Sequence, residues 1–271
     1  SIFESYIDYT EAQKTGTTTL TADDYSLPET KRATIAAGET TTTIALVIDD
    51  DSKYEDDESL TITLNDGSLS DQVLPGSDLT HDYQITNDDP KPEINFTASS
   101  GTADASSPEE ADGTETITVS LAAVTGVATS VAYSFSNSST AVLGTDFTDS
   151  TPDYDSDPDT KIISWAADDA SRGKTIVITF TDDVIDEGNE TIIIELGTPS
   201  GGGQSGTTTT THTITLQDSD TPPVMQFSSD NIAFNEADDK GTISIPLTLT
   251  HDGTNAQASD AGNAQLTWTI M

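Results

Sequence analysis

Cysteine and positive charge are what this chain has least of. None of its 271 residues is cysteine, which excludes disulfides, thiolate metal sites and cysteine nucleophiles. Only 9 Lys and Arg stand against 48 Asp and Glu, so the formal net charge is −39. Such a chain repels nucleic-acid phosphates and anionic membrane surfaces, and we expect neither as a partner. Its carboxylates need to be spaced apart by regular structure or neutralised by bound cations.

Long apolar runs and helical periodicity are also lacking. No run approaches the ~20 apolar residues of a membrane-spanning helix, so no membrane insertion is predicted. Instead, Thr-rich segments alternate apolar and polar residues, which is the pattern of half-buried strands. These segments are 41–48, 59–64, 114–121, 175–180, 191–196, 207–216 and 242–249. The sequence therefore predicts an all-β chain.

A long-range repeat divides the chain into modules. Residues 92–96 (PEINF) return as 223–227 (PVMQF), an offset of 131 (223 − 92). The acidic run at 50–58 returns at 182–190 with the same spacing of its acids. A unit of about 130 residues suits one β-sandwich. We expect the later part of a module at 1–90, a complete module at 91–221 and the opening strands of another at 222–271.

The acidic runs have the chemistry of a calcium site. Asp182 and Asp183 end one predicted strand, Gly188-Asn189 supplies a turn, and Glu190 opens the next strand. The hairpin would gather these carboxylates at one end of the sandwich. Ca²⁺ takes roughly 6–8 oxygen ligands in flexible geometry, and carboxylates supply them. The alternative is that the acids are solvated strand ends that hold no metal.

These residues resemble the Calx-beta module, which occurs in sodium–calcium exchangers and in large bacterial surface proteins. The resemblance is carried by Asp24-Tyr25, by 37–40 (AGET), by the acidic run 48–58 and by the closing pair Asp88-Asp89. It covers nearly the whole chain, although residues 170–175 (ASRGKT) replace the AGET element in the second copy. It implies tandem immunoglobulin-like antiparallel β-sandwiches, with Ca²⁺ bound at the end that faces the next module.

The resemblance also implies two sets of calcium ligands. In the complete module these are Glu110, Asp146, Asp182, Asp183, Glu187, Glu190, Asp218 and Asp220. In a site shared by the partial modules they are Asp24, Asp50, Asp51, Glu55, Glu58, Asp88, Asp89 and Glu236. Alternating acids at 153–159 mimic a calcium loop of the EF-hand type, but Pro158 stands where its glycine belongs, so an exposed acidic loop is expected there.

The chain begins and ends in mid-module, which has three explanations. It is a crop of a longer tandem array, or the pieces pair within one chain, or the C-terminal strands of one copy complete residues 1–90 of the next. The last contact is head-to-tail and propagates an open fibre. We favour an array or polymer in which the partners of the chain are copies of itself.

The predicted function is structural. We expect a calcium-binding module of an extracellular or cell-surface fibre or giant adhesin of a bacterium, with Ca²⁺ stiffening the junctions. Two alternatives are a Ca²⁺-sensing regulatory module like that of the exchangers and a glycan-binding adhesin domain. The glycan site would need exposed aromatic residues, whereas Trp165 and Trp268 fall in predicted strands. His81, His212 and His251 lie in no recognisable catalytic motif, so no enzyme is predicted.

Overall fold

Strands form nearly all the regular structure of the chain. The computed structural model describes residues 3–13, 24–70, 73–100, 110, 113–152, 161–183, 185–228, 247–251 and 254–255. Within these ranges helical backbone is limited to a 3-10 turn, η1 (Asp66–Ser68), which the Asn65 side chain caps, and to the 3-10 conformation of Glu110. No helix in the described part is long and apolar enough to cross a bilayer. The all-β prediction is confirmed.

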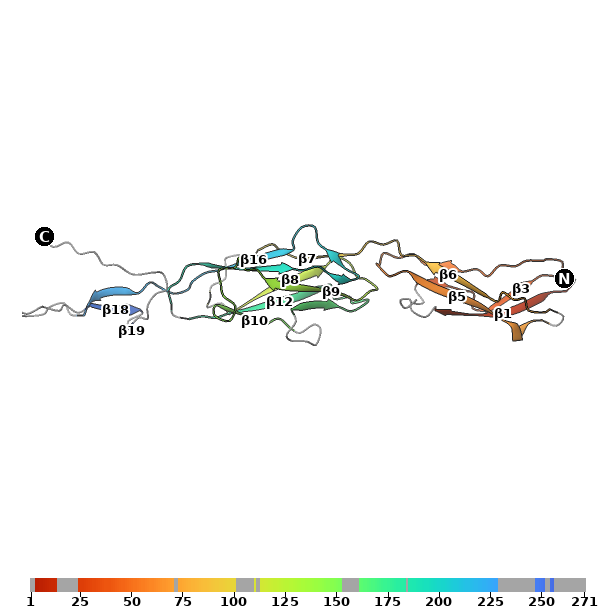
Figure 1. Cartoon of the computed structure of the whole chain (residues 1–271), viewed down its shortest axis with the longest axis horizontal. Coiled ribbons are helices and arrows are strands. Elements are labelled where there is room, and N and C mark those ends of the chain that lie inside the picture. Colours follow the sequence, from red (N-terminus) through yellow and green to blue (C-terminus); the bar gives the residue numbers. More distant parts are fainter. Residues whose placement is uncertain are drawn as a thin grey trace, which may run out of the picture.

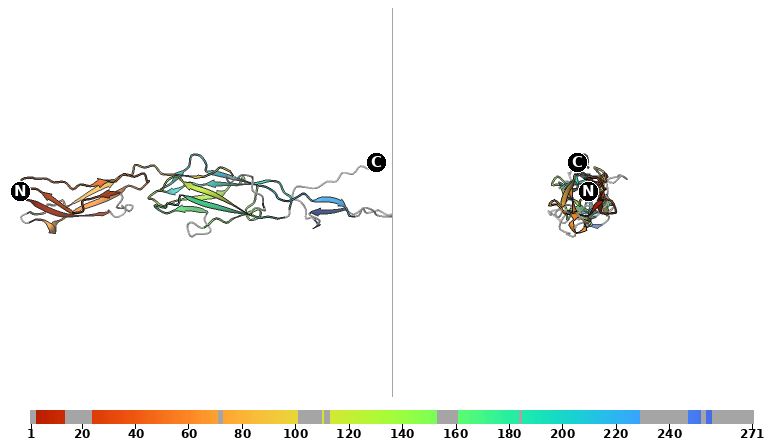
Figure 2. Two further views of the ribbon diagram at one scale, coloured as in Figure 1. Left: turned by 180° about the vertical axis from the view of Figure 1, so that it is seen from behind. Right: turned by 90° about the vertical axis from the view of Figure 1, so that its right-hand side faces the viewer.

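The strands fall into three groups along the chain. The first group is β1 (Ser5–Gln13), β2 (Tyr25–Ser26), β3 (Arg32–Ile35), β4 (Val47–Ile48), β5 (Glu58–Asn65) and β6 (Thr80–Ile85). The second is β7 (Glu93–Phe96), β8 (Thr114–Leu121), β9 (Thr129–Phe135), β10 (Phe147–Asp149), β11 (Ile162–Trp165), β12 (Gly173–Phe180), β13 (Glu190–Leu196), β14 (Ser200–Gly201), β15 (Gln204–Ser205) and β16 (Thr211–Leu216). The third is β17 (Val224–Phe227), β18 (Leu247–His251) and β19 (Thr254–Asn255). The three groups follow one another along a single axis (Figures 1 and 2).

The second group is a two-sheet sandwich. One sheet has the order β10-β12-β8-β7-β15 and the other the order β11-β9-β13-β16, with β14 added to β9. All ladders are antiparallel except the short parallel pair of β15 with β7. Alternate side chains of each strand point inward, as the period-2 pattern predicts. The resulting core is Ile94, Phe96, Ile117, Val119, Leu121, Val131, Tyr133, Ala141, Phe147, Ile163, Trp165, Ile176, Ile178, Phe180, Ile192, Ile194, Ile214 and Leu216.

The tryptophan expected in the core is there. Trp165 is 1% exposed, and its indole Nε1 donates to the Arg172 carbonyl at 3.1 Å. It is therefore not a stacking surface for a sugar. Trp268 lies outside the described residues.

The first group repeats one sheet of this sandwich. Its sheet β3-β1-β5-β6 has the order of β11-β9-β13-β16, and β2 pairs only with β4. The core is correspondingly small: Tyr9, Ala33, Leu60 and Ile62. The strand predicted at 41–48 is wrong for most of its length, because only Val47 and Ile48 enter a ladder. Their sole partner among the described residues is the two-residue β2, which cannot order a longer strand.

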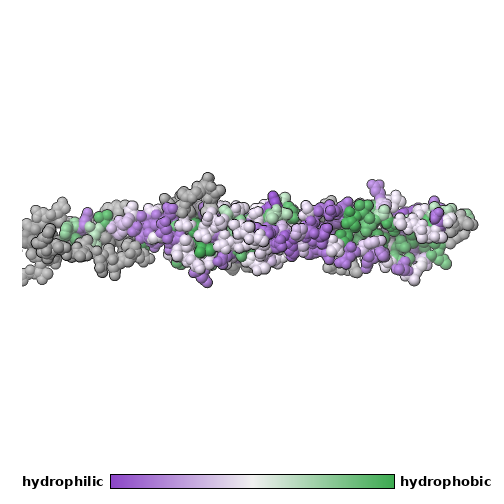
Figure 3. Space-filling model, turned by 90° about the horizontal axis from the view of Figure 1, so that it is seen from above, coloured by the Kyte–Doolittle hydropathy of each residue, from purple (hydrophilic) through white to green (hydrophobic). Residues whose placement is uncertain are grey.

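The C-terminal strands repeat the pair that opens the second module. Phe227 on β17 faces Leu247 on β18, as Phe96 on β7 faces Val119 on β8. Phe227 is 51% exposed, however, whereas Phe96 is in the core. Apolar residues also show at the surface of the first module, while hydrophilic residues gather at both ends of the second (Figure 3).

We predict that Gly201→Ala destabilises the second module by roughly 2 kcal/mol or more, because of backbone strain and a clash. Gly201 has φ +78°, and an added Cβ would lie 1.9 Å from the Ala128 carbonyl oxygen. Chemical denaturation would measure the loss. Gly173→Ala is the control in the same module, since its Cβ meets only the Thr118 methyl at 3.6 Å. Equal stability of the two variants would contradict the prediction.

Candidate metal centres

Short hydrogen bonds shape the acidic loop that leaves β12. Asp183 Oδ1 accepts from the Ile185 amide at 2.7 Å, which reverses the chain two residues after the carboxylate. Asp218, after β16, accepts from the Glu187 amide at 3.0 Å through Oδ2 and from the Asp220 amide at 3.1 Å through Oδ1. Asp218 therefore links the two acidic loops by binding backbone of both.

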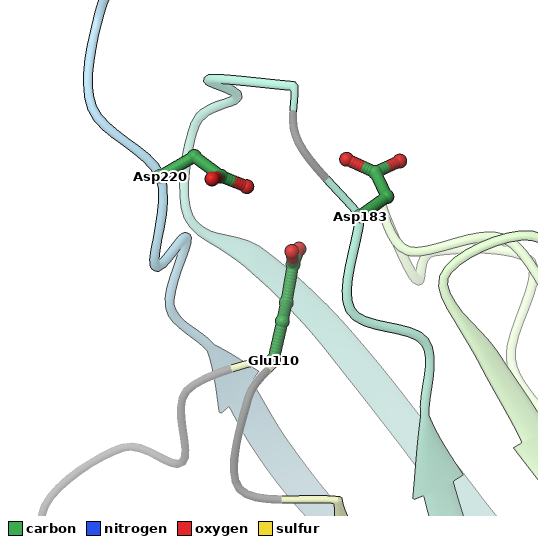
Figure 4. A group of neighbouring side chains, drawn as sticks. All are labelled: Glu110, Asp183 and Asp220. Carbon is green, nitrogen blue, oxygen red and sulfur yellow. The ribbon is translucent and has the colours of Figure 1, made fainter. Parts of the chain in front are cut away.

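Six carboxylates converge at this end of the sandwich in two groups. In the first, oxygens of Glu110, Asp183 and Asp220 all lie within 4.8 Å of one another. In the second, oxygens of Asp146, Glu187 and Glu190 do the same. Figure 4 shows the first group, in which three separate segments of the chain direct their acids toward a common point. Among the described residues, these are the groups with the spacing of metal ligands.

One acid in each group is hard to ionise. Burial raises the pKa of Glu110 to about 7, with the nearby charge of Asp218 as the next cause. Burial likewise raises the pKa of Glu190 to about 7, assisted by the charge of Asp146 and a hydrogen bond with it. Carboxylates held this close favour a cation or a proton between them. A hard divalent ion fits both groups, because every donor is a carboxylate oxygen.

Two of the eight acids predicted for this module stand beside the groups rather than in them. Asp182 accepts from the Ser219 hydroxyl at 3.3 Å, and Asp218 is occupied by the two backbone amides described above. Both add negative charge to the centre. Their bonds are those of groups that position the loops.

The first module brings its predicted acids around one pocket of about 330 Å³. The predicted acids that line it are Asp24, Asp50, Asp51, Glu55, Glu58, Asp88 and Asp89, and Asp49 and Asp56 line it as well. Glu58 is 5% exposed, and burial, followed by the charges of Asp24 and Glu55, raises its pKa to about 7. Glu236, predicted to join this site, lies outside the described residues, as does the acidic loop at 153–159.

Two residues that sequence reasoning passed over change the first cluster. The side-chain oxygen of Asn87 accepts from the Glu55 amide at 3.1 Å. A neutral side chain therefore holds the acidic loop of the first module, as the Asp218 carboxylate holds the Glu187 amide in the second. Lys53 reaches into the acids, with Nζ 3.2 Å from Glu55 Oε1 and 3.9 Å from Asp51 Oδ2. Aligning the two copies by their acids would have revealed both, because Lys53 falls opposite Ile185.

The fold and these clusters define a class: tandem β-sandwiches that gather carboxylates at their ends. The Calx-beta domain model matches residues 6–89 and 102–220. The chain belongs to the Calx-beta domain family. This sequence match, over two repeats, carries the assignment.

Three solved structures are similar to this chain at low sequence identity. The crystal structure of the apo form of the Calx CBD1 domain is 19% identical, with 48% of this chain and 100% of that chain covered and a TM-score of 0.37. The crystal structure of CBD12 from CALX1.2 is 18% identical, with 73% and 69% covered and a TM-score of 0.29. The Calx CBD2 domain is 14% identical, with 46% and 86% covered and a TM-score of 0.34. A search of curated proteins finds no match.

We predict that the metal-free protein melts at a lower temperature at pH 8 than at pH 5. Folding raises the pKa of Glu58, Glu110 and Glu190 from 4.5 to about 7. Between these values the folded state keeps protons that the unfolded state has released, so stability falls as the pH rises. We expect a drop of about 5 °C or more.

Calorimetry in chelator at the two pH values would measure this drop. Saturating Ca²⁺ should reduce it, because the cation binds the ionised carboxylates. A melting temperature that rises from pH 5 to pH 8 without metal would contradict the raised pKa values of Glu58, Glu110 and Glu190.

Proposed function

We propose that the chain is a structural calcium-binding segment of a tandem Calx-beta array. The observation that carries this proposal is the convergence of Glu110, Asp183 and Asp220 beside Asp146, Glu187 and Glu190. Asp220 belongs to the short connection between β16 and β17, so an ion held here ties the sandwich to the chain that leaves it. Ca²⁺ would thereby stiffen the junction.

The donor set favours Ca²⁺ over other divalent ions. All six ligands are carboxylates, there is no Cys in the chain, and no His takes part in either group. Zn²⁺ and other transition metals favour nitrogen and sulfur donors, while Mg²⁺ keeps several waters in strict octahedral geometry. A crowded set of acids from four segments of the chain suits the larger ion.

An extracellular or cell-surface location, in a bacterial fibre or giant adhesin, completes the proposal. Calcium sites of extracellular modules bind with Kd of about 10⁻⁴–10⁻³ M, and a site this weak is loaded where Ca²⁺ is abundant. Ions that bind only the folded state add stability by mass action, which suits a chain with neither disulfides nor a large core in its first module. The arrangement of the modules along one axis suits a load-bearing rod (Figure 2).

Completion of the first module by strands from outside it is a further part of the proposal. Its second sheet holds only β2 and β4 among the described residues, and Val47 and Ile48 are 53% and 49% exposed. The pair β17–β18 has the register of β7–β8, which fills this place in the second module. A strand pair of this type covers the open face, from an adjoining module or from another copy.

Regulatory calcium sensing of the kind found in exchangers is the alternative, and affinity separates the two. Sensor sites bind with Kd of about 10⁻⁷–10⁻⁵ M, which is well below the extracellular range. Isothermal titration with Ca²⁺ would give the value directly. A submillimolar to millimolar Kd supports the structural role, and a micromolar one supports sensing.

We predict that Glu190→Gln weakens Ca²⁺ binding at least tenfold. Glu190 is half-buried in one ligand group, so the change removes a charged donor from the ion. Glu195→Gln is the matched control, because Glu195 lies on the same strand, β13, and is exposed. Titration calorimetry and the melting temperature in Ca²⁺ and in chelator would be compared. Equal loss in both variants would mean that Ca²⁺ screens the overall charge and occupies no site.

We predict that copies of the chain associate end to end when Ca²⁺ is present, if other copies supply the missing strands. Light scattering after size exclusion and electron microscopy of single particles would detect chains or filaments. A monodisperse monomer in millimolar Ca²⁺ would contradict completion by other copies, and would leave the adjoining module of an array as the source of the strands.

A further inference from the structure

One lysine crosses from the first module to the second. The Nζ of Lys53 lies 2.9 Å from Asp168 Oδ1, 3.2 Å from Glu55 Oε1 and 3.9 Å from Asp51 Oδ2. Asp51 and Glu55 belong to the first acidic cluster, whereas Asp168 belongs to the turn between β11 and β12 of the second module. The ammonium therefore stands among three carboxylates, one of which is on the other module.

Asp168 occupies a backbone position that costs free energy. Its φ is +59°, and among the described residues it is the non-glycine residue in the left-handed region. The equivalent turn of the first module has Gly38 there, with φ +90°. Residues 167–170, and not 170–175 as the sequence suggested, therefore stand opposite the AGET element. Both turns are closed by the same bond, from Glu39 N to Ala36 O at 3.0 Å and from Asp169 N to Ala166 O at 3.2 Å. A glycine at this position would relieve the backbone strain. The ion pair with Lys53 is an interaction that glycine could not make, and it accounts for an aspartate here.

Backbone bonds connect the loop of Lys53 to the turn of Asp168 through a third segment, the loop between β8 and β9. The Tyr54 carbonyl accepts from the Gly126 amide at 3.0 Å and from the Thr125 hydroxyl at 2.9 Å. The Thr125 carbonyl accepts from the Asp168 amide at 2.9 Å. Lys53, Tyr54, Thr125 and Asp168 thus form a closed ring of contacts across the junction. The ring holds Lys53 and Asp168 at bonding distance.

The ammonium is charged throughout the physiological range. Its hydrogen bond to Asp168 is the largest cause that raises the pKa of Lys53, and its bond to Glu55 adds to the effect. An isolated exposed ion pair contributes little to stability. Here, however, removal of Lys53 would take away the ammonium that Asp51, Glu55 and Asp168 share across the junction.

We propose that Lys53 is the built-in cation of the junction between the first and second modules, holding the two in one orientation without a metal ion. The far end of the second module is built differently, because Ile185 falls opposite Lys53 in the repeat and six carboxylates converge there. The chain therefore has one junction locked by its own side chain and one acidic end open to Ca²⁺. This inference refines the proposed function, but its central test needs no Ca²⁺ at all.

Single-molecule energy transfer across the junction tests the proposal. Because the chain has no Cys, Thr30→Cys and Asn137→Cys place one dye on each module at exposed sites without competing labels. The parent protein in chelator should give one narrow distribution, which added Ca²⁺ leaves unchanged. Lys53→Ile, which installs the residue of the second copy, should lose the narrow peak in chelator and regain it in millimolar Ca²⁺. Lys53→Arg should keep the peak in both.

Asp168→Gly gives an independent arm. It installs the residue of the equivalent turn, so we expect the second module to fold with equal or higher stability while the narrow peak is lost. A parent protein that loses its narrow peak in chelator would overturn the proposal. So would Lys53→Ile or Asp168→Gly variants that keep it.

The proposed function would fail separately. If Ca²⁺ did not bind, or bound equally well to the Glu190→Gln variant, the calcium site of the second module would be refuted. It would leave the chelator measurements on Lys53 and Asp168 valid.

Discussion

Repulsion between carboxylates is the constraint on which the rest of this molecule depends. Acids from separate loops gather at one end of each module, and in the second module their oxygens lie within 4.8 Å of one another in two groups. Water alone stabilises such a group poorly once it is half-buried. Burial and the neighbouring charges raise the pKa of Glu110 and of Glu190 to about 7, which shows that ionising these carboxyls costs free energy. Because the acids lie at the junctions, whatever neutralises them also determines how one module is held against the next. The stiffness of the array therefore depends on how the charge of these carboxylates is compensated.

The sandwich provides the rigid frame for this arrangement. Isoleucines on β12, β13 and β16 alternate inward with little exposed apolar area between them, so the strand ends are fixed relative to one another. The loops then need only local bonds to place their acids. Asp183 and Asp51 each accept from the amide two residues later at 2.7 Å, which gives both copies the same turn. The two sites differ in side chains on a common backbone design.

The sequence predicted the strands of the second module well, because its apolar and polar residues alternate and both sheets are present to order them. It failed at 41–48, where alternation is equally clear but the neighbouring strand that would pair with it is not among the described residues. Family resemblance, and not spacing, indicated Glu110, since that residue lies far from the other acids in sequence. The roles of Asp218 and Asn87 as backbone acceptors depend on the approach of two loops, which no local pattern encodes.

The contrast between Gly38 and Asp168 has a consequence for longer arrays. Where a module has an acid in this turn and its predecessor has a lysine in the acidic loop, the joint is self-contained; where the turn has glycine and the loop an apolar residue, the joint relies on ions. The order of these two kinds of joint along an array would determine which of its segments are stiff and which are compliant. A fall in the Ca²⁺ concentration would then let such a rod bend at the ion-dependent joints, while the self-contained joints stayed rigid.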